Sequence, residues 1–372
     1  MKIYQCIHKY IPHIPLFEAR NGVTDEMDYE TLHRLLIEDG YASTYALGPA
    51  LALDTDQVFF TIWDYDRLQR KWAEKHGFKA KNLTEIKLAQ VEEYQPDVFY
   101  NFSAFCDDNF IRQLGKRKDR KDIYWNGIIQ PEPMTFPEYE GQISLHRPYV
   151  EYWKKQGLKA KELQPGIPSG WSDIGGGEKE IDVLFYGQFF KGMFDNRNQL
   201  IEDLLRYKLS SGVDVRCHLT YKERRSTIFR IRGLPSTTIR SPFIKFPSSL
   251  VRKHSFSPLY GRSLYEEISK ARIVVNAYTN DNSEYKSNMR LFEAIGLGAF
   301  LISEEGNYPE GFEPGVDFYT YRSSSELITQ IERVLSDWPT HAEMAANTRK
   351  KISQLYSKER QWQDFLSFVE EL

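Results

Sequence analysis

The sequence is constrained above all by a regular alternation of short apolar segments with amphipathic ones. In the first half, three strand-like segments are each followed by a helix-like segment that ends at glycine: Lys2–Ile7 and Asp28–Gly40, Gln57–Trp63 and Asp66–Gly77, Pro96–Ser103 and Asp107–Gly115. Strands and helices that alternate through short connections form a parallel sheet with helices on both faces. We therefore predict a doubly wound α/β domain.

A glycine-rich segment interrupts the alternation, which then begins again. Residues 166–180 contain five glycines and are typical of a linker or an exposed loop. After them we expect a strand at Ile181–Gly187, a helix at Asn196–Gly212 and a strand at Arg272–Tyr278. A chain of 372 residues also exceeds one ordinary hydrophobic core. We predict an N-terminal domain over 1–165, a linker over 166–180, a C-terminal domain over 181–340, and a final helix within 341–372.

Cysteine content and charge exclude several classes of protein. The three cysteines, Cys6, Cys106 and Cys217, form no CxxC pair, which argues against a disulfide framework and a zinc site. We see no signal-like apolar core near the N-terminus and no run of 18 apolar residues, so we expect a cytoplasmic protein. A net charge of -3 gives no general attraction to nucleic acid, and we expect no nucleic-acid partner.

The segment Asn288–Ser303, NMRLFEAIGLGAFLIS, places two opposite charges near the start of an apolar helix. The first turn of a helix has free N–H groups and a partial positive charge, so it attracts phosphate, and Arg290 would add a further donor. Glu293 lies on the same face, where its carboxylate could accept hydrogen bonds from ribose hydroxyls. The alternative is a local Arg290–Glu293 ion pair, worth about 0.3–0.5 kcal/mol.

This segment, followed by GFEPGVDFYTYRSSSEL at Gly311–Leu327, resembles the donor-site signature of GT-B glycosyltransferases. Two further blocks, Ile181–Leu205 and Leu259–Tyr278, agree with the C-terminal domain of that class. Within the class, the sequence is most similar to the bacterial proteins of the spore maturation protein CgeB type and to glycosyltransferase group 1. The resemblance covers residues 181–330 well and is only architectural over 1–165. It implies two Rossmann-like domains that face each other across a cleft.

The resemblance also implies roles for individual residues. Glu293 would bind the nucleotide ribose, while Arg290 and the helix start at Asn288 would hold the diphosphate. The remaining donor-side candidates are the turn at Gly187, the nearby Lys191 and Arg197, and Asn276 at the end of the preceding strand. The alternatives are a plain turn at the glycine and solvated charges at the two basic residues.

Two further features bear on this resemblance. Many retaining members carry a second Glu eight positions before the ribose Glu, but Tyr285 occupies that position here, which leaves the stereochemical outcome open. In GT-B enzymes the last helix crosses back to the N-terminal domain. Trp362, Phe365 and Phe368 form a narrow apolar stripe that suits this packing, although an ordinary terminal helix on its own domain would show it too.

Histidines are the candidates for the catalytic base. His8 follows the first predicted strand, His13 lies in the loop beyond it, and His146 ends a later strand. We expect all three to face the interdomain cleft, where a neutral imidazole could take the proton of an acceptor hydroxyl. Asp64 and Asp107 are alternatives, and each of these residues is also consistent with a surface or core-edge position. No DxD-type pair follows a strand convincingly, so we expect no metal, because helix dipoles and arginine can neutralise a leaving diphosphate.

The segment 222–254 is strongly basic. From Lys222 to Lys253 there are nine Lys or Arg residues and one acid, Glu223. Mixed with apolar residues, this pattern favours peripheral contact with anionic lipid at the inner face of a membrane, or an ordinary solvated face.

Together these patterns indicate a glycosyltransferase that uses a nucleotide sugar, with UDP favoured, and no further cofactor. Its acceptor would be a hydroxyl of a glycan, glycolipid or surface polysaccharide bound to the N-terminal domain. Two alternatives remain open, a nucleotide-sugar 2-epimerase-type enzyme and a non-catalytic protein that binds nucleotide or glycan.

Overall fold

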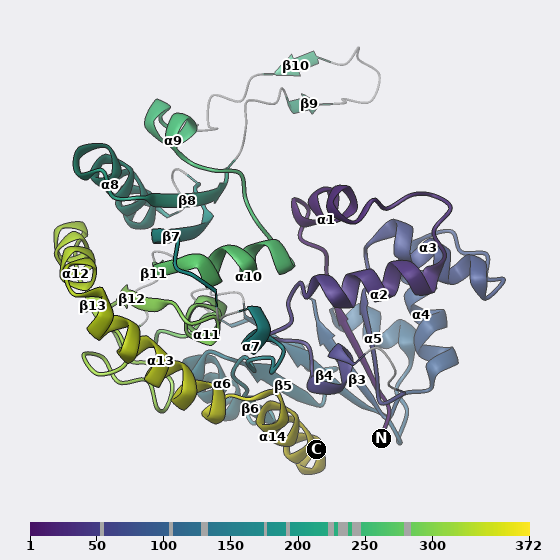
Figure 1. Ribbon diagram of the computed structural model, residues 1–372. Coiled ribbons are helices and arrows are strands. Elements are labelled where there is room, and N and C mark those ends of the chain that lie inside the picture. Colours follow the sequence, from purple (N-terminus) through teal and green to yellow (C-terminus); the bar gives the residue numbers. More distant parts are fainter. Residues whose placement is uncertain are drawn as a thin grey trace.

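The computed structural model describes residues 1–52, 56–103, 107–127, 133–174, 177–190, 194–221, 227–229, 237–239, 247–278 and 284–372. Two parallel sheets, each flanked by helices, form the two domains (Figure 1). The prediction of two doubly wound α/β domains is therefore confirmed. Cys106, Lys191 and most of the basic segment 222–254 lie outside the described residues.

The N-terminal domain is built on a six-stranded parallel sheet of order β2-β1-β3-β4-β5-β6. Its strands are β1 (Ile3–Ile7), β2 (Val58–Ile62), β3 (Val98–Phe102), β4 (Lys121–Trp125), β5 (Gly141–Ser144) and β6 (Ala160–Glu162). Its helices are α1 (His13–Asn21), α2 (Tyr29–Asp39), the 3-10 helix η1 (Gly48–Leu51), α3 (Asp66–Lys75), α4 (Leu83–Tyr94), α5 (Asp108–Leu114) and α6 (Arg147–Lys155).

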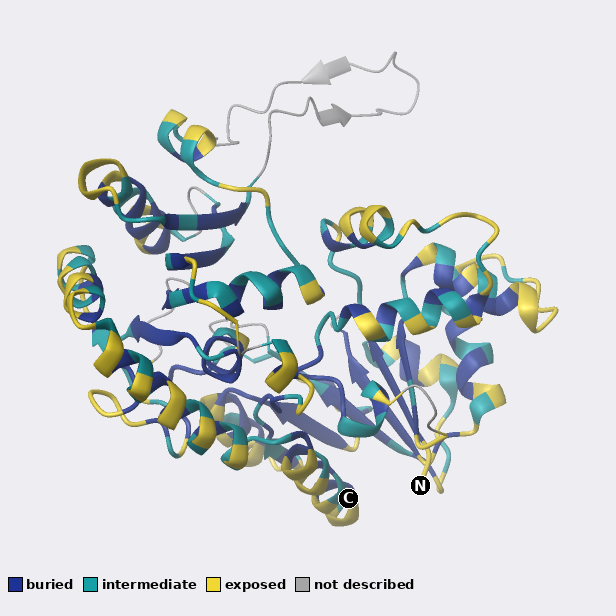
Figure 2. Ribbon diagram, in the orientation of Figure 1, coloured by how far each residue is buried: buried dark blue, intermediate teal, exposed yellow. Residues whose placement is uncertain are grey.

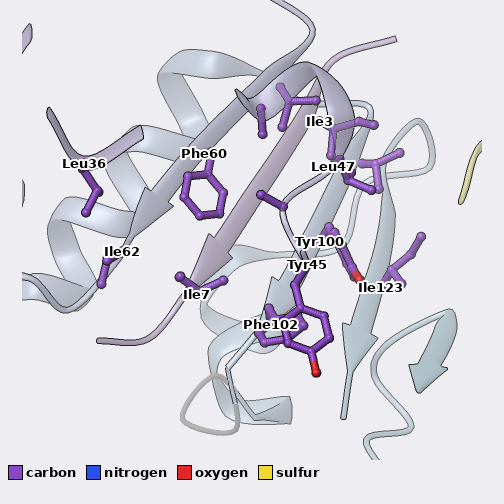
Figure 3. Close-up of a cluster of buried hydrophobic side chains, with 14 of the residues drawn as sticks. Ile3, Ile7, Leu36, Tyr45, Leu47, Phe60, Ile62, Tyr100, Phe102 and Ile123 are labelled. Atoms are coloured by element: carbon purple, nitrogen blue, oxygen red, sulfur yellow. The ribbon is translucent and has the colours of Figure 1, made fainter. Parts of the chain in front are cut away.

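The alternation of side chains along β1 creates two cores, one on each face of this sheet. Ile3 and Ile7 join the core beneath α2 and α3, while Tyr4 and Cys6 join the core beneath α4 and α5. Figure 3 shows the first core, where Leu36 of α2 faces the sheet residues. Burying both faces with apolar side chains fixes the register of the strands.

The C-terminal domain has a five-stranded parallel sheet of order β13-β12-β11-β7-β8 and a separate hairpin of β9 and β10. Its strands are β7 (Ile181–Gln188), β8 (Val215–Thr220), β9 (Thr227–Phe229), β10 (Thr237–Ile239), β11 (Ala271–Asn276), β12 (Phe300–Glu304) and β13 (Tyr319–Tyr321). Its helices are α8 (Asp195–Ser211), α9 (Ser249–His254), α10 (Gly261–Lys270), α11 (Met289–Gly296), α12 (Ser324–Ser336) and α13 (Trp338–Leu355).

The predicted final helix is two helices. α13 packs on the C-terminal domain, and α14 (Lys358–Glu371) begins after a break at Tyr356, because Ser357 caps a new helix by accepting a hydrogen bond from the N–H of Arg360. α14 lies on the N-terminal domain (Figure 1), where Phe365 and Phe368 are buried in the core beside the sheet. The expected crossing of the C-terminal helix is thus present.

The glycine-rich segment 166–180 is only partly exposed. It contains the short helix α7 (Trp171–Ile174), and Ile167 and Trp171 are buried in the core of the C-terminal domain. The N–H of Ile167 donates to the carbonyl oxygen of Tyr356 at 2.7 Å, so the two segments that cross between the domains run side by side. Figure 2 shows the buried strands and the exposed outer faces of the helices around this crossing.

Candidate functional site

A cavity of about 360 Å³ lies between the two domains. Its N-terminal wall comes from the ends of β1 and β3 and from the segment after α2: Ile7, His8, Tyr10, Tyr41, Ala42, Tyr45 and Phe102. Its C-terminal wall comes from β7, β8, the start of α10 and the start of α11, and includes Tyr186, Gly187, His218, Tyr260, Asn288, Arg290 and Glu293. Carboxyl ends of parallel strands are the usual place for a ligand in such sheets.

α11 presents its polar residues to this cavity. Asn288 caps the helix, since its side chain accepts a hydrogen bond from the N–H of Leu291. Asn276, at the end of β11, accepts hydrogen bonds from Asn288 Nδ2 at 3.0 Å and from Arg290 Nη1 at 2.8 Å. Asn276 is fully buried and does not line the cavity, so it positions the two residues that do.

Arg290 and Glu293 do not form the local ion pair that was the alternative interpretation. Arg290 Nη1 also approaches the carbonyl oxygen of Ala277 at 3.3 Å, and its Nη2 donates to the carbonyl oxygen of Tyr186 at 2.6 Å. Among the described residues its buried Nε has no hydrogen-bond partner. A guanidinium has five N–H donors, so Arg290 retains capacity for an anion after holding the ends of β7 and β11 together.

Glu293 is buried in the wall of the cavity, with 4% of its surface exposed. One carboxylate oxygen accepts a hydrogen bond from Tyr186 Oη at 2.7 Å. Burial raises the pKa of Glu293, while the hydrogen bond from Tyr186 and the charge of Arg290 oppose that shift. A buried carboxylate with one hydrogen bond suits a ligand that brings further donors, such as a diol.

Gly187 is a glycine for two physical reasons. Its φ is 155°, in a region that side chains rarely adopt, and a Cβ there would lie 3.1 Å from Arg290 Nη2. The backbone at the end of β7 therefore approaches Arg290 closely. A plain turn was the alternative for this position, and the close approach to Arg290 is a feature that a plain turn does not require.

Arg197, in the first turn of α8, is buried and forms no ion pair with an acid in the part of the chain that the structure describes. Only 7% of its surface is exposed, its guanidinium stacks over the ring of Phe194 at 4.2 Å, and its Nε and Nη2 have no hydrogen-bond partner among the described residues. Burial, followed by the nearby charge of Arg290, lowers the pKa of Arg197 to about 10 against a weaker opposing effect of Glu304. Arg197 does not line the cavity, so an anion there would meet Arg290 first and feel Arg197 from behind it.

Of the three predicted histidines, only His8 lines the cavity. Burial lowers the pKa of His8, although the charge of Asp64 opposes the shift. His13 is instead at the start of α1, stacked on Tyr41 at 4.1 Å, with its Nε2 3.0 Å from a carboxylate oxygen of Asp39. His13 therefore does not line the cavity. Its ring lies 6.0 Å from that of Tyr260 in the other domain, so it is packed at the domain boundary instead of facing open space.

His146 also lies away from the cavity. It is 3% exposed before α6, between the rings of Tyr149 at 4.8 Å and Tyr285 at 5.8 Å. Burial lowers the pKa of His146 to about 4. The prediction that His146 faces the cleft is therefore corrected as well.

Tyr285, at the position where a second Glu was considered, binds the N-terminal domain instead. Its hydroxyl donates to Glu162 Oε1 at 2.5 Å and accepts from Gln164 Nε2 at 3.2 Å. Ser287 Oγ donates to Gln164 Oε1 at 2.7 Å, and Arg147 lies over the ring of Tyr285. We call this group the Tyr285 cluster; it connects the segment directly before α11 to the end of β6.

An aromatic and polar surface at the other end of the cavity was not predicted from the sequence. His218 of β8 contacts the carbonyl oxygen of Ser257 at 2.7 Å and Glu267 at 3.3 Å, and Tyr260 Oη lies 2.6 Å from Thr220 Oγ1. A lone histidine within an apolar strand gives no sequence signal for a site, because the sequence does not show which face of β8 is turned toward the cavity.

Two absences hold for the part of the chain that the structure describes. No group of three or more His, Cys, Asp or Glu side chains there could hold a metal ion. None of the described helices is both long and apolar enough to cross a lipid bilayer.

Comparison with known proteins identifies the class of fold. Residues 218–367 match a family model described as glycosyl transferase-like, and no protein with a curated description matches the chain. The solved structure of Anabaena HepE with UDP and glucose aligns with a TM-score of 0.60 and 13% identity over 100% of both chains. Sucrose-phosphate synthase from Thermosynechococcus elongatus aligns with a TM-score of 0.52 and 11% identity over 100% of this chain and 99% of that one.

A third solved structure, Staphylococcus aureus TarM in complex with fondaparinux, α-GlcNAc-glycerol and UDP, aligns with a TM-score of 0.53 and 12% identity. It covers 77% of this chain and 59% of that one. At these identities the likeness shows the fold, which is the GT-B arrangement that the sequence predicted. The narrower resemblance to the CgeB type stays a prediction.

Proposed function

We propose that this protein is a glycosyltransferase that moves a sugar from a nucleotide-diphosphate sugar to an acceptor hydroxyl. The observation that carries the proposal is Arg290, which lines the interdomain cavity together with Glu293 and has an unpartnered Nε among the described residues. Arg197 does not line the cavity, but it is buried and close enough to Arg290 for the two charges to influence each other. The glycosyl transferase-like match and the UDP complexes of the structural neighbours support it. UDP is the favoured nucleotide because the solved structures of these neighbours contain UDP.

On the donor side, the two arginines and the N-terminus of α11 at Asn288 would hold the diphosphate, and Glu293 would accept hydrogen bonds from the ribose hydroxyls. As the bond between the sugar and the diphosphate breaks, negative charge grows on the leaving oxygen. Donors already fixed in a cavity stabilise that charge without reorganisation. Lys191 remains a proposed further donor outside the described residues.

On the acceptor side, His8 is the proposed base. Its lowered pKa keeps the imidazole neutral at neutral pH, so it can take the proton of the attacking hydroxyl as the new bond to the sugar forms. The acceptor would be a glycan, glycolipid or surface polysaccharide. A cytoplasmic location, and contact of the segment 222–254 with a membrane, belong to this proposal and rest on sequence alone.

The test is thermal stabilisation of the wild type and of Glu293→Ala by UDP, GDP, CDP, ADP and dTDP. We expect UDP to stabilise the wild type and not the variant, because the variant lacks the carboxylate that is proposed to accept the ribose hydrogen bonds. Lack of stabilisation by every nucleotide in the wild type would contradict the proposal.

A second measurement separates the enzyme classes. Incubating UDP-sugars with the protein and no acceptor should yield slow release of UDP by hydrolysis if it is a glycosyltransferase. Isomerisation of the sugar nucleotide would favour the epimerase-type alternative, and nucleotide binding without any turnover, even with glycan acceptors, would favour the non-catalytic one.

A further inference from the structure

A second cavity, of about 690 Å³, lies on the C-terminal domain, away from the interdomain cavity. It is lined by the segment 167–172, the end of α11 and one face of α13, and it is open to solvent on one side. Three small residues, Gly298, Ala342 and Ala346, are among its lining, while Gly296 lets Ile167 and Trp171 pack closely against the end of α11. A volume between about 300 and 1,000 Å³ is typical of sites for small organic molecules.

Basic side chains gather in this cavity. Lys179, Arg349 and Lys350 line it, and Glu359, at the exposed start of α14, is the one acid among its described lining residues. Lys179 Nζ donates to the carbonyl oxygen of Ser269 at 2.7 Å and makes no ion pair with any carboxylate in the described chain. The cavity therefore contains an excess of positive charge.

Lys179 and Arg349 are close enough to influence each other. Burial, and then the charge of Arg349, lower the pKa of Lys179 to about 8. Arg349 Nη2 donates to the carbonyl oxygen of Trp171 at 3.0 Å, and burial lowers the pKa of its guanidinium. The two cations come from different elements, the segment after α7 and helix α13, and both line the same cavity.

We propose that this cavity binds the phosphoryl group of a small phosphate monoester between Lys179 and Arg349. A dianion matches two cations, and arginine with lysine is a common pair of phosphate donors. The apolar wall of Ile167, Trp171 and the alanines of α13 would contact the organic part of the ligand. This site shares no residue with the donor site, so the inference does not depend on the proposed function.

The probe is phenyl phosphate, titrated by calorimetry at pH 7 with the donor site saturated by UDP. Because the donor site could also take a phosphate, the titration is repeated in Arg197→Met, in which that site loses a cation while the second cavity is unchanged. We expect one molecule of phenyl phosphate per chain in both proteins. Inorganic phosphate, which lacks the organic part, and benzoate, which lacks the second charge, should each bind more weakly.

Three variants locate the site. Lys179→Met and Arg349→Met should each weaken phenyl phosphate at least tenfold, the effect of losing one charge-assisted hydrogen bond. Lys155→Met, which removes an exposed charge from α6, is the matched control and should change nothing. Affinity of the wild type should also fall between pH 7 and pH 9.5 as Lys179 loses its proton, and Lys179→Met should abolish that dependence.

The outcomes are decisive in both directions. Absence of binding to wild type and Arg197→Met alike, or equal binding by Lys155→Met and both cavity variants, would overturn the proposal. Melting temperatures measured for each variant confirm that it is folded. If Arg349→Met does not fold, Lys179→Met alone still tests the proposal, because the methionine side chain replaces the apolar stem of the lysine and preserves the packing.

Discussion

Replacing Arg197 by methionine should make the ligand-free protein more stable and its donor binding weaker. Among the described residues the buried guanidinium has no hydrogen-bond partner for Nε or Nη2, and burial lowers its pKa by more than two units, to about 10. One pKa unit corresponds to about 1.4 kcal/mol, so keeping Arg197 charged in the folded state costs about 3 kcal/mol at neutral pH. Methionine fills much of the same space without a charge to desolvate.

The sign of this effect follows from linkage. A base whose pKa is lower in the folded than in the unfolded state destabilises the fold at every pH below the folded value, and neutral pH is well below 10. Allowing for relaxation around the new side chain, we expect a gain of about 1–3 kcal/mol in the free energy of unfolding of Arg197→Met.

Binding should change in the opposite direction. A charge-assisted hydrogen bond contributes about 1.5–3 kcal/mol, so the affinity for UDP should fall by about ten- to a hundredfold. Chemical denaturation with and without UDP measures both quantities in one series. Arg206→Met, at an exposed position on the same helix α8, is the control, and its loss of surface ion pairs should cost under about 1 kcal/mol and leave UDP affinity unchanged.

The opposite pair of results would refute this reasoning. If Arg197→Met is less stable than the wild type and binds UDP equally well, Arg197 supports the fold through its contact with Phe194. The two arginines would then not form a diphosphate site.

Three further variants test other parts of the site. Gly187→Ala should weaken UDP binding at least tenfold in calorimetry, because its Cβ meets Arg290 and its φ is strained, whereas Gly212→Ala, outside the site, should leave it unchanged. The ratio kcat/KM should fall as the pH drops through the lowered pKa of His8. In His8→Gln this fall at acidic pH should vanish, together with a large loss of kcat. An unchanged pH profile would exclude His8 as the base. Tyr285→Phe should lose about 0.5–1.5 kcal/mol of stability in denaturant titrations, and equal stability would show that its bond to Glu162 is immaterial.

The fold was predictable because its signals are local and periodic. Strands buried on both faces are largely apolar, and many helices begin at a side-chain cap or end at a glycine, so β1, α2, β7 and α11 all appear at the expected residues. The break before α14 was missed because Tyr356 and Ser357 do not interrupt the apolar spacing; only the change of domain explains it. Helix α1 was missed because His13 directly follows Ile11 and Pro12, and the proline suggests a loop.

The site was predictable only where one element carries its residues. Asn288, Arg290 and Glu293 share one helix turn, and the structure places all three on the interdomain cavity. His8 and His146 looked alike in sequence, yet one lines the cavity and the other is buried beside Tyr285. Which residues meet across domains depends on the rotation of one domain against the other, which no local pattern encodes.

The hydrogen bond between Ile167 and Tyr356 has a consequence for motion. The chain passes between the domains twice, and at this bond the two passages are fastened at one point. We therefore expect relative motion of the domains to be mainly a rotation about an axis through this point, with little sliding of one domain past the other. The Tyr285 cluster lies beside this axis and directly before α11. A rotation that opens the cavity for a donor would therefore also displace Asn288, the residue that caps α11.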